Sequence, residues 1–326
     1  MAKARAIVKR RKAVRNIRKI TKTMQMIATA KFQKALKRAV GTKPYTLKVR
    51  ELVGELAATV GDVEHPLLRK VTDADRKKRI ALLVITSNRG LAGAYNGSVL
   101  RSATVFIKQQ EAAGNAVDLY VVGKKGLSFF AFQKRAIKTR FETNMDALRF
   151  TDVERGAETL VQQFVAGDLD AVYVSYMNFI STGVQRAENM QLLPLAGIQQ
   201  TLDHIGKQTA EKEAQQAAGA LDAKRSGAGV KHETADSGEQ AVYEFSPEPR
   251  EILDYLLPLT VKTALFQTFL DAVTSENIAR MVAMKSATDN ADKMVKALTM
   301  EYNRARQSQI TTELSEIMGG VEAMKK

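Results

Sequence analysis

The chain has 326 residues, no cysteine and a formal net charge of +15. The length suffices for one large domain or two ordinary ones, and the lack of cysteine excludes disulfide scaffolds, thiolate metal sites and thiol regulation. The charge is local: residues 1–50 carry seventeen Lys or Arg and no acid, whereas the remainder carries 33 basic and 35 acidic residues. The basicity therefore belongs to one segment and does not make the whole protein a nucleic-acid binder.

Residues 3–58 are predicted to form a long basic helix, which Pro44 should bend or interrupt. Large apolar residues recur at steps of 7, 3, 3, 4 and 3, which predicts one helical stripe: Ile7, Val14, Ile17, Ile20, Met24 and Ile27. Such a helix could pack on another helix, bind nucleic acid, lie on a membrane or serve as a transit peptide. Nucleic acid is disfavoured because Phe32 is the only aromatic residue before position 45. A membrane surface is disfavoured because alanine and threonine occupy much of the apolar face.

The central segment, 79–200, alternates predicted strands and helices, as in an α/β layer domain. Strands are expected at 79–87, 116–123, 136–143, 170–182 and 187–195, and helices at 97–113, 124–134 and 152–166. The last two strands should form an antiparallel hairpin, so the prediction is a Rossmann-like, mostly parallel five-stranded sheet. The longest uninterrupted apolar run, 80–85, has the length of a strand and is too short to span a membrane.

The turn "SNRGLAGAYNG" (87–97) follows a strand and precedes a helix, where a phosphate-binding loop would lie. It lacks the P-loop lysine, and its glycines do not fit G-x-G-x-x-G, so a structural turn is favoured over a nucleotide site. The three histidines, His65, His204 and His232, are far apart and show no ligand spacing. No catalytic residues, cofactor or metal site is predicted.

Residues 203–241 are rich in Ala, Gln, Glu, Lys and Gly and are expected to be a low-complexity insertion. The last block, 250–326, is predicted to be a second long helix. Val295, Leu298, Tyr302 and Ala305 step by 3, 4 and 3, and Ile310, Leu314 and Ile317 should continue the stripe after a phase slip. We expect the helices of 1–58 and 250–326 to bury their stripes against each other as an antiparallel coiled coil.

Three segments carry a family resemblance. "VRNIRKITKTMQMIATAKFQKA" (14–35) and the block 275–320 resemble the terminal helices of the γ subunits of F-type ATP synthases. "TSNRGLAGAYN" (86–96) resembles that family's Ser-Asp-Arg-Gly-Leu-Cys-Gly turn, with Asn88 and Ala92 at the Asp and Cys positions. The resemblance implies a central-stalk rotor without a catalytic site of its own. Rotation of a c-subunit ring would drive conformational cycling of catalytic β subunits during ATP synthesis or, in reverse, hydrolysis.

The resemblance also implies partners and contact residues. The partners are the α and β subunits, the ε subunit and the c ring, with no nucleic acid. Attachment to the cytoplasmic face of a bacterial inner membrane would come only through the complex. Contacts with the α/β hexamer match Met24, Arg280, Arg306, Gln307, Thr311 and Glu313, and contacts with the c ring or ε match Tyr243 and Glu244. The alternatives are a basic coiled-coil protein that binds nucleic acid and, less favoured, an enzyme that uses the α/β domain.

Overall fold

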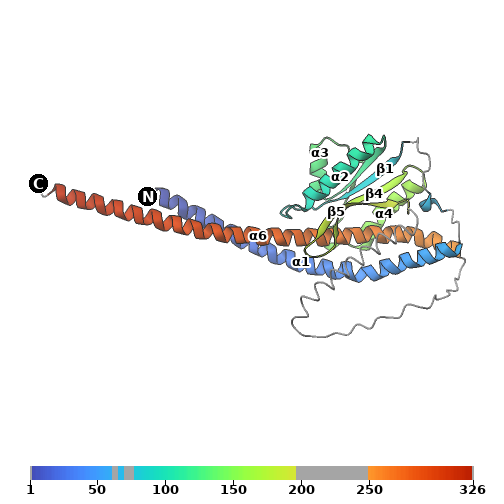
Figure 1. Cartoon of the computed structure of the whole chain (residues 1–326), viewed down its shortest axis with the longest axis horizontal. Helices are drawn as coiled ribbons and strands as arrows, with labels where there is room; N and C mark the ends of the chain where they lie inside the picture. The colour runs from blue at the N-terminus through green and yellow to red at the C-terminus, as the bar shows by residue number, and fades with distance from the viewer. Residues whose placement is uncertain (1, 61–64, 70–76, 196–248, 325–326) are drawn as a thin grey trace, which may run out of the picture. The chain divides into compact units, whose positions relative to one another are not determined.

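The computed structural model describes residues 2–60, 65–69, 77–195 and 249–324. Two long helices, α1 (Ala2–Val60) and α6 (Pro249–Ala323), come from the two ends of the chain, and a sheet domain is formed by the sequence between them (Figure 1). This confirms the predicted fold class. The described chain separates into two compact units: residues 1–33, 91–93 and 277–326 form the first, and residues 34–90 and 94–276 form the second. The insertion predicted at 203–241 lies outside the described residues.

Helix α1 runs through Pro44 without a break, so an interruption there is not observed. Proline deprives the carbonyl of residue 40 of its helical N–H donor. Pro44 is exposed and the side chain of Val40 is 59% exposed, so that carbonyl lies on a side where it can bind water. Beyond the proline, Val53 and Leu56 are buried in the core of the second unit, and this packing holds the helix together.

The sheet has five strands in the order β3-β2-β1-β4-β5. The strands are β1 (Arg79–Ile85), β2 (Ala116–Val122), β3 (Thr139–Phe141), β4 (Ala171–Phe179) and β5 (Gln185–Leu193). β1 to β4 are parallel, and β5 pairs antiparallel with β4, as the sequence predicted. Leu82 and Leu83, neighbours on β1, are both fully buried, as is expected of a central parallel strand covered on both faces.

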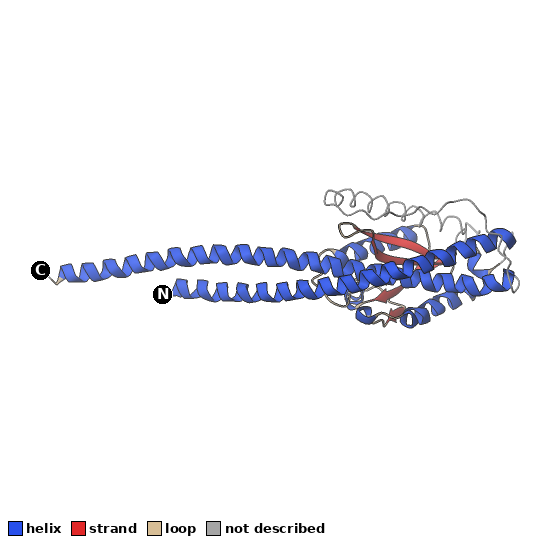
Figure 2. Cartoon of the chain, turned by 90° about the horizontal axis from the view of Figure 1, so that it is seen from below, coloured by secondary structure: helices blue, strands red, loops and turns tan. Residues whose placement is uncertain are grey.

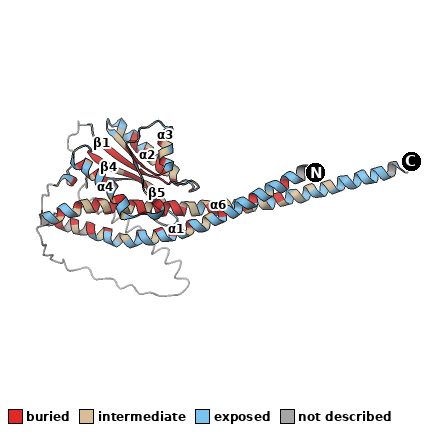
Figure 3. Cartoon of the chain, turned by 180° about the vertical axis from the view of Figure 1, so that it is seen from behind, coloured by how far each residue is buried: buried red, intermediate tan, exposed pale blue. Residues whose placement is uncertain are grey.

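Helices cover both faces of the sheet. They are α2 (Tyr95–Ala112), α3 (Lys124–Phe132) and α4 (Phe150–Val165), with short 3-10 turns η1 (Pro66–Leu68) and η2 (Met145–Ala147). α2 and α3 lie on one face, whereas α4 and the adjoining part of α6 lie on the other (Figure 1). On α6, Leu257, Val261, Leu265 and Phe269 recur every four residues and are at most 1% exposed. Figure 3 shows this part of α6 as largely buried and its C-terminal part as largely exposed.

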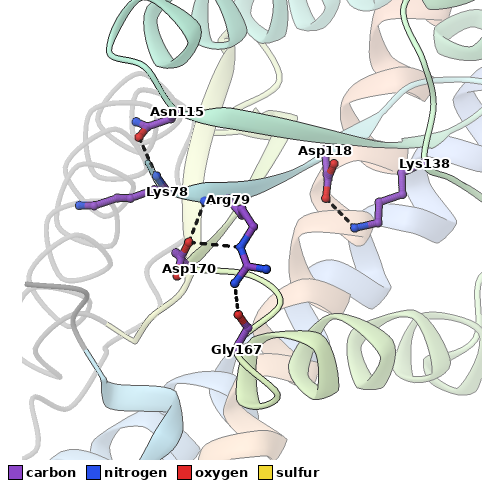
Figure 4. Close-up of polar contacts among 7 residues, drawn as sticks. All are labelled: Lys78, Arg79, Asn115, Asp118, Lys138, Gly167 and Asp170. Carbon is purple, nitrogen blue, oxygen red and sulfur yellow. Dashed lines mark hydrogen bonds and ion pairs between the residues drawn. The ribbon is translucent and has the colours of Figure 1, made fainter. Parts of the chain in front are cut away.

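Polar side chains close the edge of the sheet where the parallel strands begin (Figure 4). Asp170, 3% exposed, accepts a hydrogen bond of 2.8 Å from the backbone N–H of Arg79, and the Arg79 guanidinium also donates to the Gly167 carbonyl. The Asn115 side chain accepts a bond of 3.1 Å from the N–H of Lys78. A buried carboxylate requires such partners, so this cluster is structural: it fixes the starts of β1 and β4.

Helix α6 is also long and apolar enough, over Glu251–Val321, to be considered as a membrane span. Its most apolar stretch has a mean hydropathy of 1.2, and 56% of that stretch is buried inside the protein. The core helix of a folded domain passes the same test. The burial of Leu257 and Leu265 against the sheet explains the apolar composition without a membrane.

Candidate functional site

The first unit contains an antiparallel pair of helices (Figure 2), which share a narrow apolar seam. Its buried cluster consists of Ile7 and Val14 from α1 and Ala291 and Leu298 from α6, with Val295, Tyr302 and Ala305 half-buried beside it. The four α6 residues predicted for the stripe, Val295, Leu298, Tyr302 and Ala305, are therefore all confirmed at the seam. Seven-residue steps dominate on both helices, as in a coiled coil.

The stripe predicted on α1 is partly wrong. Ile17, Ile20 and Ile27 are 52%, 59% and 52% exposed, whereas Thr21 and Ala28 are buried. The seam follows strict heptads through residues 7, 14, 21 and 28, where a threonine and an alanine replace large apolar side chains. Selecting the largest apolar residues shifted the predicted stripe to the neighbouring face. The three isoleucines thus form a second apolar row that the described chain leaves exposed.

The stripe predicted beyond residue 305 of α6 is wrong as well. Ile310, Leu314 and Ile317 are 48%, 55% and 63% exposed. The pair is antiparallel and Ile7, near the start of α1, packs in the cluster that contains Leu298 and half-buried Tyr302, so the described residues of α1 leave this last stretch uncovered. Every described residue from 311 to 321 is exposed. In this part of α6, the apolar side chains lie on a helix that has no partner helix among the described residues.

Cations cover the exposed side of α1. The first acidic residue of α1 is Glu51, so the cations in its first half have no acidic neighbour in their own helix. The described examples are exposed: Lys9, Arg10, Lys12, Arg15, Lys19 and Lys22. Two other cations contact α6. Arg18 forms an ion pair with Asp292, and the Arg11 guanidinium carbon lies 4.9 Å from the centre of the Tyr302 ring. The helix pair therefore presents a basic surface with apolar rows, which suits an acidic and partly apolar partner.

The structure separates the predicted contact residues into two groups. Met24 and Arg280 are half-buried, on α1 and α6 respectively. Arg306, Gln307, Thr311 and Glu313 are exposed near the end of α6. At 1.5 Å per residue, positions 280 and 306 are about 39 Å apart along α6, so the two groups of predicted contact residues lie on separate parts of the helix pair. Tyr243 and Glu244 lie outside the described residues.

Hydrogen bonds organise the end of α6. Thr311 donates to the carbonyl of Gln307 at 3.0 Å, and Glu313 accepts 2.8 Å from the amide of Gln309. Sequence reasoning did not single out Gln309. An i to i+4 pair of Gln and Glu is a signal that could have identified it.

The turn after β1 binds the start of α3, where a nucleotide phosphate lies in many α/β folds. Asn88 Oδ1 accepts from the N–H of Lys124 at 3.1 Å, the Ser87 carbonyl accepts from Lys125 at 3.1 Å, and Thr86 Oγ1 accepts from Gly126 at 2.9 Å. The first three N–H groups of α3, which have no partner within the helix, are thus bound by protein. The turn has a structural role, as the sequence favoured.

Replacing Asn88 with alanine is expected to lower the free energy of unfolding by about 1 kcal/mol, because it removes the acceptor for the first N–H of α3. Asn88→Asp keeps an acceptor and places a negative charge at the helix N-terminus, so its stability should equal or exceed that of the wild type. Urea unfolding of the full chain, followed by circular dichroism, compares the two variants. Equal losses for both would show that the bond from Asn88 to Lys124 does not stabilise the protein.

The backbone is strained at Leu91, just after this turn, because its φ is 61°. Its side chain is 61% exposed, so burial of the side chain does not explain the conformation. Within the first unit, Gly93 (φ 55°) lies against α6, and a Cβ on it would be 3.8 Å from the Cβ of Ala283. Both conformations favour glycine. A leucine held in this conformation with its side chain in solvent marks a site at which the surrounding structure enforces the backbone path.

A polar clamp in the second unit joins α4 to α6. Lys262 Nζ donates to Glu158 at 2.6 Å and to Glu154 at 3.0 Å. The hydrogen bond to Glu158 is the main reason that the pKa of Lys262 is raised above its usual value. Beside the clamp, the rings of Phe150 and Phe266 pack edge to face at 5.5 Å. Sequence reasoning missed this clamp because its members are more than 100 residues apart.

Lys262→Gln is expected to destabilise the protein by ~1 kcal/mol at pH 8, the upper end for partly exposed ion pairs. Because the folded protein raises the pKa of Lys262, this contribution is fully present below the unfolded pKa, about 10.5, and is lost as pH rises through the higher folded pKa. Chemical unfolding at pH 8 and at pH 11 measures both. Lys285→Gln, on the exposed surface of α6, is the control and should change stability by less than about 0.5 kcal/mol. A pH-independent loss would contradict the charged clamp.

Within the described ranges, no three His, Asp or Glu side chains are grouped to hold a metal ion. The candidate functional features of the described chain are instead exposed: the outer faces of the helix pair, the unpaired end of α6 and the turn after β1. Such features suit a protein that acts through contact with partners.

Comparison with known proteins identifies the family. The ATP synthase family model matches residues 3–324. An ATP synthase gamma chain from Rhodopirellula baltica is 40% identical over 328 aligned positions and covers 100% of both chains. One from Leptospira biflexa is 36% identical over 324 positions, covering 99% of this chain and 100% of that one. Nothing in these comparisons supports the alternative of a nucleic-acid-binding protein.

Solved structures agree in fold. A chain of the Euglena gracilis mitochondrial ATP synthase, in a structure with OSCP, F1 and the c-ring, matches with a TM-score of 0.61 at 17% identity, covering 99% of this chain and 95% of that one. A chain from the central stalk and c-ring of the Tetrahymena thermophila enzyme matches with a TM-score of 0.54 at 21% identity, covering 82% and 99%. Together with the full-length matches in sequence, the paired helices and five-stranded sheet show that the chain belongs to the ATP synthase gamma chain family.

Proposed function

We propose that the chain is the central rotor of a proton-translocating ATP synthase. It couples rotation of a c-subunit ring to the conformational cycle of the catalytic β subunits, in ATP synthesis and in the reverse reaction. The observation that carries the proposal is the end of α6, where Ile310, Leu314 and Ile317 are about half-exposed or more on a helix with no covering element in the described chain. Exposed apolar side chains at helical spacing require an enclosing partner.

The α and β subunits are the proposed partners of the helix pair. Their contacts are assigned to Met24 and Arg280 in one region and to Arg306, Gln307, Thr311 and Glu313 in the other. The exposed cations of α1 support this assignment, because each exposed ion pair is worth only ~0–1 kcal/mol and can break and re-form as the rotor turns. Many weak contacts of this kind can keep the helix pair bound to the hexamer while still allowing it to rotate.

The ε subunit and the c ring are the proposed partners of the remaining chain, with contacts at Tyr243 and Glu244. In this division, 1–58 and 250–326 form the shaft, 79–200 forms the domain that receives torque, and 203–241 is an insertion. The chain supplies no catalytic group and uses no cofactor. It associates with the cytoplasmic face of the bacterial inner membrane only through the complex.

Co-purification tests the proposal. The tagged full chain, recovered at moderate salt, should bring with it a hexamer, built from two kinds of larger subunit, that hydrolyses ATP. Recovery of nuclease-sensitive material alone, without ATPase activity, would overturn the rotor and favour the basic coiled-coil protein that binds nucleic acid. Binding of nucleotide by the chain itself would instead favour an enzyme.

A further inference from the structure

The seam of the helix pair in the first unit is unusually polar. Between residues 7 and 28, about six turns, α1 contributes a residue to the seam every three or four positions. Four of these seven are polar or charged: Ile7, Arg11, Val14, Arg18, Thr21, Gln25 and Ala28. Three of the polar residues meet partners on α6: Arg11 lies over the ring of Tyr302, and Arg18 and Thr21 contact polar side chains. Polar residues in a coiled-coil seam lower stability but specify alignment.

The most buried of these contacts joins two hydroxyl groups. Thr21 is 9% exposed and Thr288 is 6% exposed. Thr288 Oγ1 lies 2.8 Å from Thr21 Oγ1 and 2.8 Å from the carbonyl of Met284, and the Thr21 hydroxyl donates to the carbonyl of Arg18 at 3.1 Å. The two residues are 267 positions apart in sequence, so this bond connects the two ends of the chain. A buried hydroxyl is stabilised only when such partners are present.

An ion pair lies about one helical turn away on each helix. Arg18 precedes Thr21 by three residues, Asp292 follows Thr288 by four, and their side chains are paired across the seam. Their side chains are 50% and 43% exposed, so the pair adds little stability by itself. The ion pair contributes specificity instead. Apolar contact is non-directional and accepts many apolar neighbours, whereas a charged side chain favours a neighbour of opposite charge.

Sliding the helices by one heptad, about 10 Å, would keep the apolar seam in phase. The slide would place Thr21 opposite Met281 in one direction and opposite Val295 in the other. Either apolar neighbour would remove the contact between the two hydroxyls and leave each with only the acceptor in its own helix.

The charged residues oppose the same slides. Arg18 would meet Lys285 in one direction, which brings like charges together, and Thr299 in the other, which leaves Asp292 without Arg18. We propose that the Thr21–Thr288 hydroxyl pair and the Arg18–Asp292 ion pair hold the local register of α1 against α6 in the first unit, outside the stretch in which both helices pack in the core of the second unit. The residues act as positioning residues of the shaft, and the inference holds for the chain whether or not the proposed function is correct.

Spin-label distances test the register. The chain has no cysteine, so the exposed positions Lys12 and Ser315 can be replaced by cysteine and labelled in the full-length protein. Double electron–electron resonance should give one narrow distance distribution in the parent. The variant T21V/T288V/D292N should add a second population, because the labels move along the axis by up to about 10 Å.

Matched variants decide the outcome. T23V/T312V/D289N makes the same chemical changes at exposed positions and should leave the distribution unchanged, as should T21S/T288S, which keeps both hydroxyls. R18D should give the second population, and R18D/D292R should remove it. A single, unshifted distribution in the folded T21V/T288V/D292N variant would overturn the proposal. If that variant loses its helical circular dichroism, failure of D292R to rescue R18D would overturn it instead.

Discussion

Replacing Gly123 with alanine is expected to lower the free energy of unfolding by more than about 3 kcal/mol. Gly123 has φ of 89°, and a Cβ there would lie 2.1 Å from the carbonyl oxygen of Thr86 and 2.9 Å from that of Ser87. Both obstacles are backbone atoms of the turn that binds the start of α3. Because that turn is itself tied to α3, neither backbone segment can move without breaking these hydrogen bonds.

The control for Gly123 is a glycine of the same domain in open space. Gly97 lies on the exposed side of α2, and a Cβ on it would meet nothing within 4 Å. Gly97→Ala should raise stability by roughly 0.5–1 kcal/mol, because alanine is the better helix former. Chemical unfolding of both full-length variants measures the contrast. Losses of similar size at both positions would show that the close approach of Gly123 to Thr86 does not limit stability.

The elements of the sheet domain could be predicted from sequence because each carries a local signal. Strand β1 is an unbroken apolar run ending at Ile85, and the short connection from β4 to β5 permits only a hairpin. Helix α6 was recognisable from heptad spacing at Leu298 and Tyr302. These signals depend on neighbours in the sequence, so they needed no knowledge of the tertiary structure.

The candidate site was less predictable because it depends on residues distant in sequence. Which residues of α1 lie in the seam depends on the side chains of α6 that face them. Thr21 is buried there, in contact with Thr288, whereas the larger Ile20 is exposed. The partners of Lys262 and Thr288 lie more than 100 positions away. The contact residues suggested by family resemblance stay predictions, since an exposed residue such as Arg306 acquires its role only from a partner surface.

Leucines on α6 separate the internal from the external role of this helix. Leu298 is 7% exposed, in the small cluster formed with Ile7, Val14 and Ala291, whereas Leu314 is 55% exposed. Leu298→Ala should weaken the helix pair by about 2–3 kcal/mol, because it leaves a cavity in a cluster that has few other contacts. Amide hydrogen exchange should therefore accelerate around Ile7 and Val14, and much less in the strands of the sheet.

Leu314→Ala should have the opposite profile. It changes an exposed side chain, so the stability of the free chain and the exchange of α1 should change by less than about 0.5 kcal/mol. If α6 enters the proposed hexamer, the loss of this apolar contact should weaken association with the α and β subunits by about tenfold, or 1.4 kcal/mol. Titration of labelled chain into the isolated hexamer measures the association. Faster exchange of α1 in Leu314→Ala would mean that residue 314 contacts α1, and unchanged affinity would remove Leu314 from the proposed interface. The pair of variants thus distinguishes a helix that stabilises its own chain from one that serves a partner.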